Sequence, residues 1–327
     1  MSLCPHSVHP TRKDENEREH ARANLALFQQ SVPELTVSVA EAELLENPIA
    51  VNTPALDFTI TPWQPAVGAI VKGLRYSGGT LPESAQHALK QALLQHGLLS
   101  FEPGTVTGQN FTEFLEAFGE VVLYSGPQTP AVSKETQANI VDSTDKKVAR
   151  NYIWHIDQAF RPNPPNYTAL FGKAVPEFGG DTLFSNAVAA YERLDPLFTA
   201  YLETLTAVHY WDATGHMSDR FLDKQEYARQ RALNAPIETS IVRVHPETGK
   251  KQLFVNESYT TYIKGVSRTV SQSLLTILFE AIKSPEVQGR FSWTPGTLVL
   301  WDNRTVQHRG IGDFAKQSRV FYRACVN

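Results

Sequence analysis

Beyond Gly119 the chain consists mostly of short β-type runs separated by prolines and glycines. Runs rich in β-branched and aromatic residues, bounded by turn-forming residues, are typical of strands. Examples of the predicted strands are residues 168–175, 237–245, 251–256 and 296–303. Many short strands with few helices favour a mainly β fold with flanking helices, in which the sheet closes into a barrel or jelly roll.

Four segments have helical character instead. The first follows Thr80 and Pro82, which suit a helix start, and ends at Gly97, which suits a helix end. The second begins after Asn110, and the others are residues 186–205 and 270–283. Apolar side chains at helical spacing predict one buried face for three of them. These side chains are Ala85, Ala88, Leu89, Ala92 and Leu93 in the first helix, Phe111, Phe114, Leu115 and Phe118 in the second, and Leu274, Ile277, Leu278, Ala281 and Ile282 in the last.

The length and the N-terminal composition predict one main domain with an extension. A chain of 327 residues can bury one sizeable core. Residues 1–60 show no convincing apolar period and are rich in charge before Leu25. We therefore expect residues 1–60 to be an extension packed on the core, and residues 61–327 to form a single domain.

Charge and cysteine content exclude several classes of protein. The formal net charge is −4, so no excess of Lys and Arg is available to neutralise a row of phosphates, and nucleic acid is not an expected partner. Cys4 and Cys325 are too far apart in sequence for a zinc ribbon or a disulfide framework. The N-terminus is polar, and no run of about 18 apolar residues occurs. We expect a cytoplasmic protein that acts on a small molecule without a membrane partner.

Three residues form a candidate metal site. His155 and Asp157 are two positions apart, and side chains at i and i+2 of a strand leave the same face. An HxD pair alone is weak evidence, because it also occurs by chance. His308 follows a second predicted buried strand, and two histidines with one carboxylate form the facial triad that leaves open positions on Fe(II). Open positions are what the activation of O2 requires.

Two arginines near the C-terminus suggest what else the site binds. A 2-oxo acid can occupy two of the open positions, and a diacid such as 2-oxoglutarate needs a cation for its far carboxylate. Arg319 and Arg323 lie on a predicted terminal strand, in which residues 319, 321 and 323 share one face. The alternative is that both arginines form surface ion pairs.

These residues and several longer motifs resemble the taurine dioxygenase (TauD/TfdA-like) family of Fe(II)/2-oxoglutarate-dependent oxygenases. The resemblance implies a double-stranded β-helix, also called a jelly roll. It implies that His155, Asp157 and His308 bind iron, that Thr182 and Arg319 bind the distal carboxylate of 2-oxoglutarate, and that Asn151 lies near the cosubstrate or substrate. The alternative for Thr182 is a simple turn between strands. The motifs are residues 68–74 (GAIVKGL), 118–120 (FGE), 154–157 (WHID) with Phe160, 178–192, 242–261 and 301–308 (WDNRTVQH).

The resemblance is weakest where the substrate would bind. Family members that act on taurine use a histidine soon after the FGE motif, and this chain has Tyr124 at that position and Pro127 close by. Taurine is therefore disfavoured. Arg323 still suits a small substrate with a carboxylate or, less so, a sulfonate, and we expect an amino-acid-derived metabolite of secondary metabolism. Phe160, Tyr210 and Trp211 are candidates for its apolar walls, although large aromatics near a β core more often serve packing.

The expected reaction is oxidation of an unactivated C–H bond, with release of succinate and CO2. Hydroxylation is the default, and desaturation, ring closure and C–N bond formation stay open. Halogenation is disfavoured because Asp157 occupies the position that halide would need. Two alternatives are a zinc metallohydrolase, which would leave Arg319 and Thr182 unexplained, and a non-catalytic jelly-roll protein that binds small acids. The resemblance also suggests a homodimer or tetramer.

Overall fold

The computed structural model describes residues 57–124, 131–134, 136–144, 152–213, 223–314 and 317–327. All of them belong to one compact unit that begins at Pro48. Residues 1–56 of the expected extension lie outside the described residues. The expected boundary after residue 60 falls inside the first described strand, β1 (Thr59–Pro62), which pairs with β2 (Ala69–Lys72).

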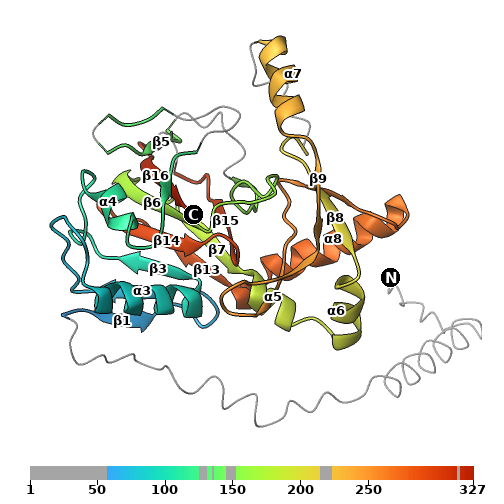
Figure 1. Cartoon of the computed structure of the whole chain (residues 1–327), viewed down its shortest axis with the longest axis horizontal. Coiled ribbons are helices and arrows are strands. Elements are labelled where there is room, and N and C mark those ends of the chain that lie inside the picture. Colours follow the sequence, from blue (N-terminus) through green and yellow to red (C-terminus); the bar gives the residue numbers. More distant parts are fainter. Residues whose placement is uncertain (1–56, 125–130, 135, 145–151, 214–222, 315–316) are drawn as a thin grey trace, which may run out of the picture. The chain divides into compact units, whose positions relative to one another are not determined.

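An eight-stranded sheet is the largest sheet of the fold (Figure 1). Its strands run in the spatial order β1, β2, β3, β14, β6, β16 and β4, and β5 also pairs with β16. Only the β2 and β3 pair is parallel among these pairings. The strands not yet bounded are β3 (Leu98–Phe101), β4 (Val121–Val122), β5 (Asn139–Asp142), β6 (Tyr167–Ala174), β14 (Leu298–Asp302) and β16 (Val320–Val326).

A smaller sheet packs on one face of the large one. It consists of β13 (Gln288–Phe291), β7 (Thr182–Asn186) and β15 (Val306–Gly310), in that order. One apolar cluster joins Leu170, Val299 and Trp301 of the large sheet to Phe184 and Val306 of the small sheet. Two sheets sharing one core in this way agree with the expected jelly roll.

Alternation along β14 shows how the large sheet is buried on both faces. Val299 and Trp301 point into the core between the sheets, while Leu298 and Leu300 belong to a second core on the other face. Helices α3 (Glu83–His96) and α4 (Phe111–Leu115) contribute to this second core. β14 is fully buried for this reason, and it holds the residues that follow it in a fixed position.

A third group of elements packs around α8 (Arg268–Lys283). It contains a three-stranded sheet in the order β12, β8, β9 and the pair β10 and β11. Helix α7 extends away from these elements in Figure 1 and has no buried residue. The bounds are α5 (Ala187–Glu192), α6 (Pro196–Leu202), α7 (Lys224–Leu233), η3 (Pro285–Val287), β8 (Thr206–His209), β9 (Ile237–Ser240), β10 (Val242–Val244), β11 (Lys251–Leu253) and β12 (Thr260–Ile263).

Most predicted elements are confirmed, with differences in their bounds. All five predicted core residues of the first helix are buried in α3, although this helix begins at Glu83 rather than near Thr80. The predicted helix 186–205 is divided into α5 and α6, because Pro196 starts a new helix. Ile277 was wrongly placed on the buried face of α8 and is 48% exposed. At 100° per residue it lies about 100° from the centre of the face that contains Leu274, Leu278 and Ile282.

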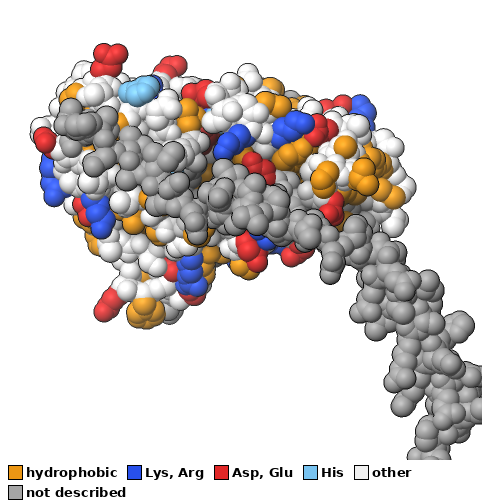
Figure 2. Space-filling model, turned by 90° about the horizontal axis from the view of Figure 1, so that it is seen from below, with side chains coloured by type: hydrophobic (Ala, Val, Ile, Leu, Met, Phe, Trp, Pro, Cys, Tyr) orange, Lys and Arg blue, Asp and Glu red, His pale blue; other side chains and the backbone are white. Residues whose placement is uncertain are grey.

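The surface seen in Figure 2 mixes both charges. Lys and Arg side chains are interspersed with Asp and Glu side chains on this face, in agreement with the small net charge of −4. Within the described part of the chain, every helix is too short or too polar to cross a membrane.

Candidate metal centre

The structure brings His155, Asp157 and His308 together in the interior. One potential ligand atom from each lies within 4.8 Å of the others, and all three residues are buried. Nε2 of His155 is 3.6 Å from Oδ1 of Asp157, and the two imidazole centroids are 4.2 Å apart. Side chains separated by about 150 positions in sequence therefore meet at one point.

The backbone sets this arrangement by a single bridge between strands. The amide of His155 donates to the carbonyl of His308 at 3.1 Å, and the amide of His308 donates to the carbonyl of His155 at 3.0 Å. His308 lies within β15, but His155 is an isolated bridge and Asp157 begins a turn. The expectation of a strand through both residues of the HxD pair is thus wrong, because pairing stops after one residue.

A hydrogen bond fixes the tautomer of His155. Its Nδ1 lies 2.8 Å from the carbonyl oxygen of Ile153. A carbonyl oxygen only accepts, so Nδ1 carries the proton and Nε2 presents a lone pair. Nε2 is the atom that faces Asp157. This is the arrangement by which proteins orient a metal-binding imidazole.

The protonation states of the other two residues also suit a metal. Burial opposes ionisation of Asp157, but Arg323 and the two histidines lower the pKa of Asp157 below its ordinary value. Burial, followed by His155, lowers the pKa of His308 well below its ordinary value, so its imidazole is neutral. Oδ2 of Asp157 and Nδ1 of His308 are buried without a hydrogen-bond partner. A deprotonated carboxylate, a neutral imidazole at His308 and unsatisfied buried atoms fit an Fe(II) ion.

The same three residues line a small pocket of about 50 Å³ that also contains a buried arginine. Arg319 is 4% exposed, and its Nε donates to the carbonyl of Gly180 at 2.9 Å. Burial lowers the pKa of Arg319 to about 10, so it remains a cation at neutral pH. Among the described residues no carboxylate forms an ion pair with it. The pocket therefore offers a positive charge to an anion.

The hydroxyl of Thr182 is oriented towards this pocket by two donors. Trp293 Nε1 donates to Thr182 Oγ1 at 2.9 Å, and Arg319 Nη2 donates to the same atom at 3.4 Å. A hydroxyl has two acceptor sites and one donor, so its own proton is left for another acceptor. Thr182 and Arg319 both line the pocket, where they present donors to one place.

Arg323 lies between the metal cluster and Tyr124. Its Nη2 is 2.8 Å from Oδ1 of Asp157, and its Cζ is 5.4 Å from the centre of the Tyr124 ring. Burial disfavours the charge on Arg323, but Asp157, together with Cys325, Tyr124 and Tyr259, offsets burial and raises the pKa of the guanidinium. Arg319, Phe321 and Arg323 all line the pocket, which confirms that they share one face of the terminal strand.

The other predicted site residues are placed elsewhere. Phe160 and Trp211 lie in a separate aromatic cluster with Tyr210 and Tyr259 packed against it, and none of these four lines the metal pocket. Phe160 borders a wider groove of about 800 Å³ beside α7. Asn151 lies outside the described residues.

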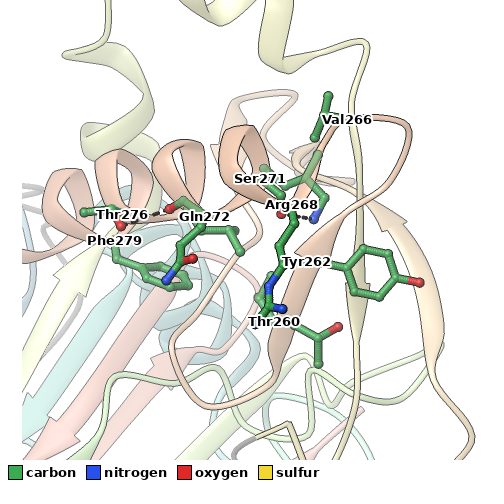
Figure 3. A pocket seen from close by; sticks show the side chains of 11 residues that line it. Thr260, Tyr262, Val266, Arg268, Ser271, Gln272, Thr276 and Phe279 are labelled. Carbon is green, nitrogen blue, oxygen red and sulfur yellow. Dashed lines mark hydrogen bonds between the residues drawn. The ribbon is translucent and has the colours of Figure 1, made fainter.

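A larger groove between β12 and α8 has no comparable chemistry. Its volume is about 700 Å³, and Figure 3 shows the Arg268 side chain extending from the start of α8 towards Thr260. The other lining side chains are apolar, hydroxyl or amide groups, and no acid or histidine of the described residues lines it. The metal pocket is the smaller cavity, but its residues carry the reactive groups.

Two residues of this region were not singled out from the sequence. Trp293 orients Thr182, and the side chain of Asn303 binds the backbone of Asp157. Asn303 lies in the WDNRTVQH motif, two positions after the buried Trp301. A polar residue directly after a fully buried strand was the available signal. Nothing in the local sequence marks the indole of Trp293 as a hydrogen-bond donor to a residue 111 positions away.

Comparison with known proteins agrees with this geometry. Residues 59–325 match the family described as taurine catabolism dioxygenase TauD, TfdA family. The chain is 35% identical over 262 residues to an alkylsulfatase of Acinetobacter baylyi, covering 79% of this chain and 81% of the relative. It is 29% identical over 280 residues to an alpha-ketoglutarate-dependent sulfate ester dioxygenase of Pseudomonas putida, covering 84% and 91%.

Solved structures confirm the fold. The crystal structure of a taurine dioxygenase from Burkholderia xenovorans matches with a TM-score of 0.69 at 27% identity, over 83% of this chain and 91% of that chain. The predicted jelly roll and the predicted family are therefore both confirmed. The chain belongs to the TauD/TfdA family of alpha-ketoglutarate-dependent dioxygenases, enzymes that use Fe(II), 2-oxoglutarate and O2.

Proposed function

We propose that His155, Asp157 and His308 hold Fe(II), that Arg319 and Thr182 bind the distal carboxylate of 2-oxoglutarate, and that Arg323 holds an anionic substrate. The observation that carries this proposal is one buried pocket that combines a cluster of two imidazoles and a carboxylate with the cation Arg319. A zinc hydrolase would need the three ligands but would have no use for Arg319.

The protein's own residues prepare the pocket for this chemistry. When bound at such a triad, Fe(II) supplies the activation of O2 coupled to oxidation of 2-oxoglutarate. His155 presents Nε2 because Nδ1 is engaged with the carbonyl of Ile153. Arg319 and Thr182 present an N–H and an O–H to a carboxylate, and a pocket walled by Leu170, Trp301 and Phe321 keeps water away from the reacting groups.

The substrate is proposed to be a small molecule with a sulfate, sulfonate or carboxylate group. Arg323 is an obligate cation whose side chain is 18% exposed, and its Nε is buried without a hydrogen-bond partner. Two relatives are named for alkyl sulfate or sulfate ester substrates, which moves the preference from a carboxylate towards a sulfate or sulfonate. Tyr124, packed on Arg323, keeps taurine disfavoured. Hydroxylation of a C–H bond near the anionic group is the expected outcome.

Succinate formation and O2 uptake test this function directly. The purified protein, loaded anaerobically with Fe(II), should produce succinate from 2-oxoglutarate faster when an alkyl sulfate or alkyl sulfonate is added. Matched alkyl carboxylates and taurine complete the panel. Asp157→Ala should abolish both Fe(II) binding and turnover. If wild-type protein failed to bind Fe(II), or the variant retained turnover, the assignment would be wrong.

A further inference from the structure

We infer that Asn303 is a positioning residue that fixes the backbone of Asp157, so that one continuous segment, β14, the turn after it and β15, sets the positions of all three proposed metal ligands. This inference rests on the proposed function, because it takes the triad as the metal site. It concerns a residue that does not line the metal pocket.

The need for such a residue follows from the backbone around Asp157. His155 is held by the two hydrogen bonds of its bridge to His308. Pairing ends there, and Asp157 enters a turn in which the ladder bonds of a strand are missing. A buried amide and carbonyl without ladder partners must be satisfied in some other way.

The side chain of Asn303 supplies what the ladder does not. Its Oδ1 accepts from the amide of Asp157 at 2.8 Å, and its Nδ2 donates to the carbonyl of Asp157 at 3.0 Å. The same Nδ2 donates to the carbonyl of Pro165 at 3.0 Å. Asn303 is 0% exposed, so these bonds do not compete with water. The primary amide thus holds both backbone groups of Asp157 as a neighbouring strand would.

The three ligands are connected to the segment from β14 to β15 in different ways. His308 is part of β15, His155 is bound to β15 through the backbone of His308, and Asp157 is bound through the side chain of Asn303. Asn303 lies in the turn between β14 and β15. A shift of this turn would therefore move Asp157 relative to His308.

The turn itself is held firmly. The amide of Asn303 donates to the carbonyl of Asn166 at 2.8 Å. The preceding residue, Asp302, is 3.0 Å from Nε2 of His245 and 2.6 Å from Nη2 of Arg304. His245 belongs to the HPETG segment, so this network joins two of the motifs found in the sequence. Asn303 is therefore attached to a rigid part of the protein.

Asparagine suits this role better than its nearest relatives. Aspartate would keep an acceptor for the Asp157 amide, but it would turn a second oxygen towards the carbonyls of Asp157 and Pro165. It would also add a buried negative charge close to a metal ligand. Alanine would leave the amide and carbonyl of Asp157 unsatisfied.

The test compares Asn303→Ala and Asn303→Asp with Asn110→Ala. Asn110 is a matched control, because its Oδ1 accepts from the amide of Thr107 and its Nδ2 donates to the carbonyl of Tyr76, and it does not line the metal pocket. Each protein is titrated anaerobically with Fe(II) and with Co(II), whose visible absorption reports ligand geometry. Thermal unfolding is measured in parallel.

The Asn303 variants should bind Fe(II) about 10 to 100 times more weakly and should show an altered Co(II) spectrum. Asn110→Ala should lose thermal stability but keep the Fe(II) affinity and the Co(II) spectrum of the wild-type protein. Unchanged Fe(II) affinity and an unchanged Co(II) spectrum in folded Asn303 variants would overturn the inference. Wild-type protein that bound no Fe(II) would instead overturn the proposed function.

Hydrogen exchange in wild-type protein provides a readout that does not depend on the variants. The amide of Asp157 should be protected in the metal-free protein, since Asn303 accepts its proton. Rapid exchange at Asp157, alongside a protected amide at His308, would show that Asn303 does not hold this backbone, and the inference would fall even if no Asn303 variant folded.

Discussion

Nη2 of Arg323 lies 2.8 Å from Oδ1 of Asp157, while Oδ2 of the same carboxylate is buried without a hydrogen-bond partner. Oδ1 also lies 3.6 Å from Nε2 of His155, so this acid group faces both a fixed cation and a histidine of the cluster. The charge of Arg323 is coupled to the ionisation of Asp157 for this reason. A substitution at Arg323 should change both the affinity for the substrate and the pH below which the protein no longer binds metal.

Arg323→Gln should raise the KM for the anionic substrate by roughly 30-fold or more, since loss of one member of a buried charge pair costs about 2 kcal/mol or more. Arg323→Lys keeps the charge, so its KM for the anionic substrate should lie between the values of Arg323→Gln and wild type. The KM for 2-oxoglutarate should change much less, because its carboxylate is assigned to Arg319. Steady-state kinetics with each compound varied separately provides the measurement, and an unaffected substrate KM would count against the role of Arg323.

The same substitution predicts a shift in pH dependence. Arg323 lowers the pKa of Asp157, and the ionised carboxylate is the form that binds metal. Metal binding should therefore be lost on acidification through the pKa of Asp157, and Arg323→Gln should move this loss to higher pH. Fe(II) affinity measured anaerobically across a pH series tests the direction. A shift to lower pH would contradict the coupling.

Trp293→Phe should weaken the binding of 2-oxoglutarate by up to about 10-fold. The indole N–H is one of the two donors that orient the hydroxyl of Thr182, and a neutral hydrogen bond contributes about 0.5 to 1.5 kcal/mol. Trp211→Phe removes a buried indole from a different aromatic cluster and serves as the control. Anaerobic titration calorimetry of the Fe(II)-loaded variants gives the affinity of each for 2-oxoglutarate. Equal losses of 2-oxoglutarate affinity in Trp293→Phe and Trp211→Phe would indicate a general packing effect instead.

Asp302→Asn should destabilise the protein by about 3 to 5 kcal/mol at neutral pH, because it leaves Arg304 and His245 without their buried acid. Burial opposes ionisation of Asp302, but His245 and Arg304 lower its pKa below 3.8. A depressed acid pKa stabilises the folded state above the unfolded value and loses this contribution as pH falls. The difference between wild type and variant in urea unfolding should thus shrink below about pH 4. A constant difference down to pH 2 would contradict the ion pair.

The sequence predicts the reactive groups better than it predicts their surroundings. Residue type and spacing point to His155, Asp157 and His308, because few other arrangements bring two imidazoles and an acid together. The strand expected through the HxD pair is wrong, since whether pairing continues beyond His155 depends on its distant partner strand. Local pattern carries no information about that partner.

Long-range hydrogen bonds and aromatic packing were the features that the sequence predicted least well. Asn303 and Trp293 act on residues more than 100 positions away, so neither role has a local signature. Phe160 and Trp211 have the composition of a ligand-binding wall, but they lie in a cluster away from the lining of the metal pocket. Aromatic residues that pack against each other and those that line a site look the same in sequence.

An anaerobic crystal structure with Fe(II) and 2-oxoglutarate tests the central proposal most directly. The iron, located by its anomalous scattering, should be bound by one nitrogen each of His155 and His308 and by an oxygen of Asp157. The far carboxylate of 2-oxoglutarate should lie within hydrogen-bond distance of Arg319 and Thr182. Iron bound elsewhere, or a cosubstrate whose far carboxylate does not reach Arg319, would contradict the proposed site.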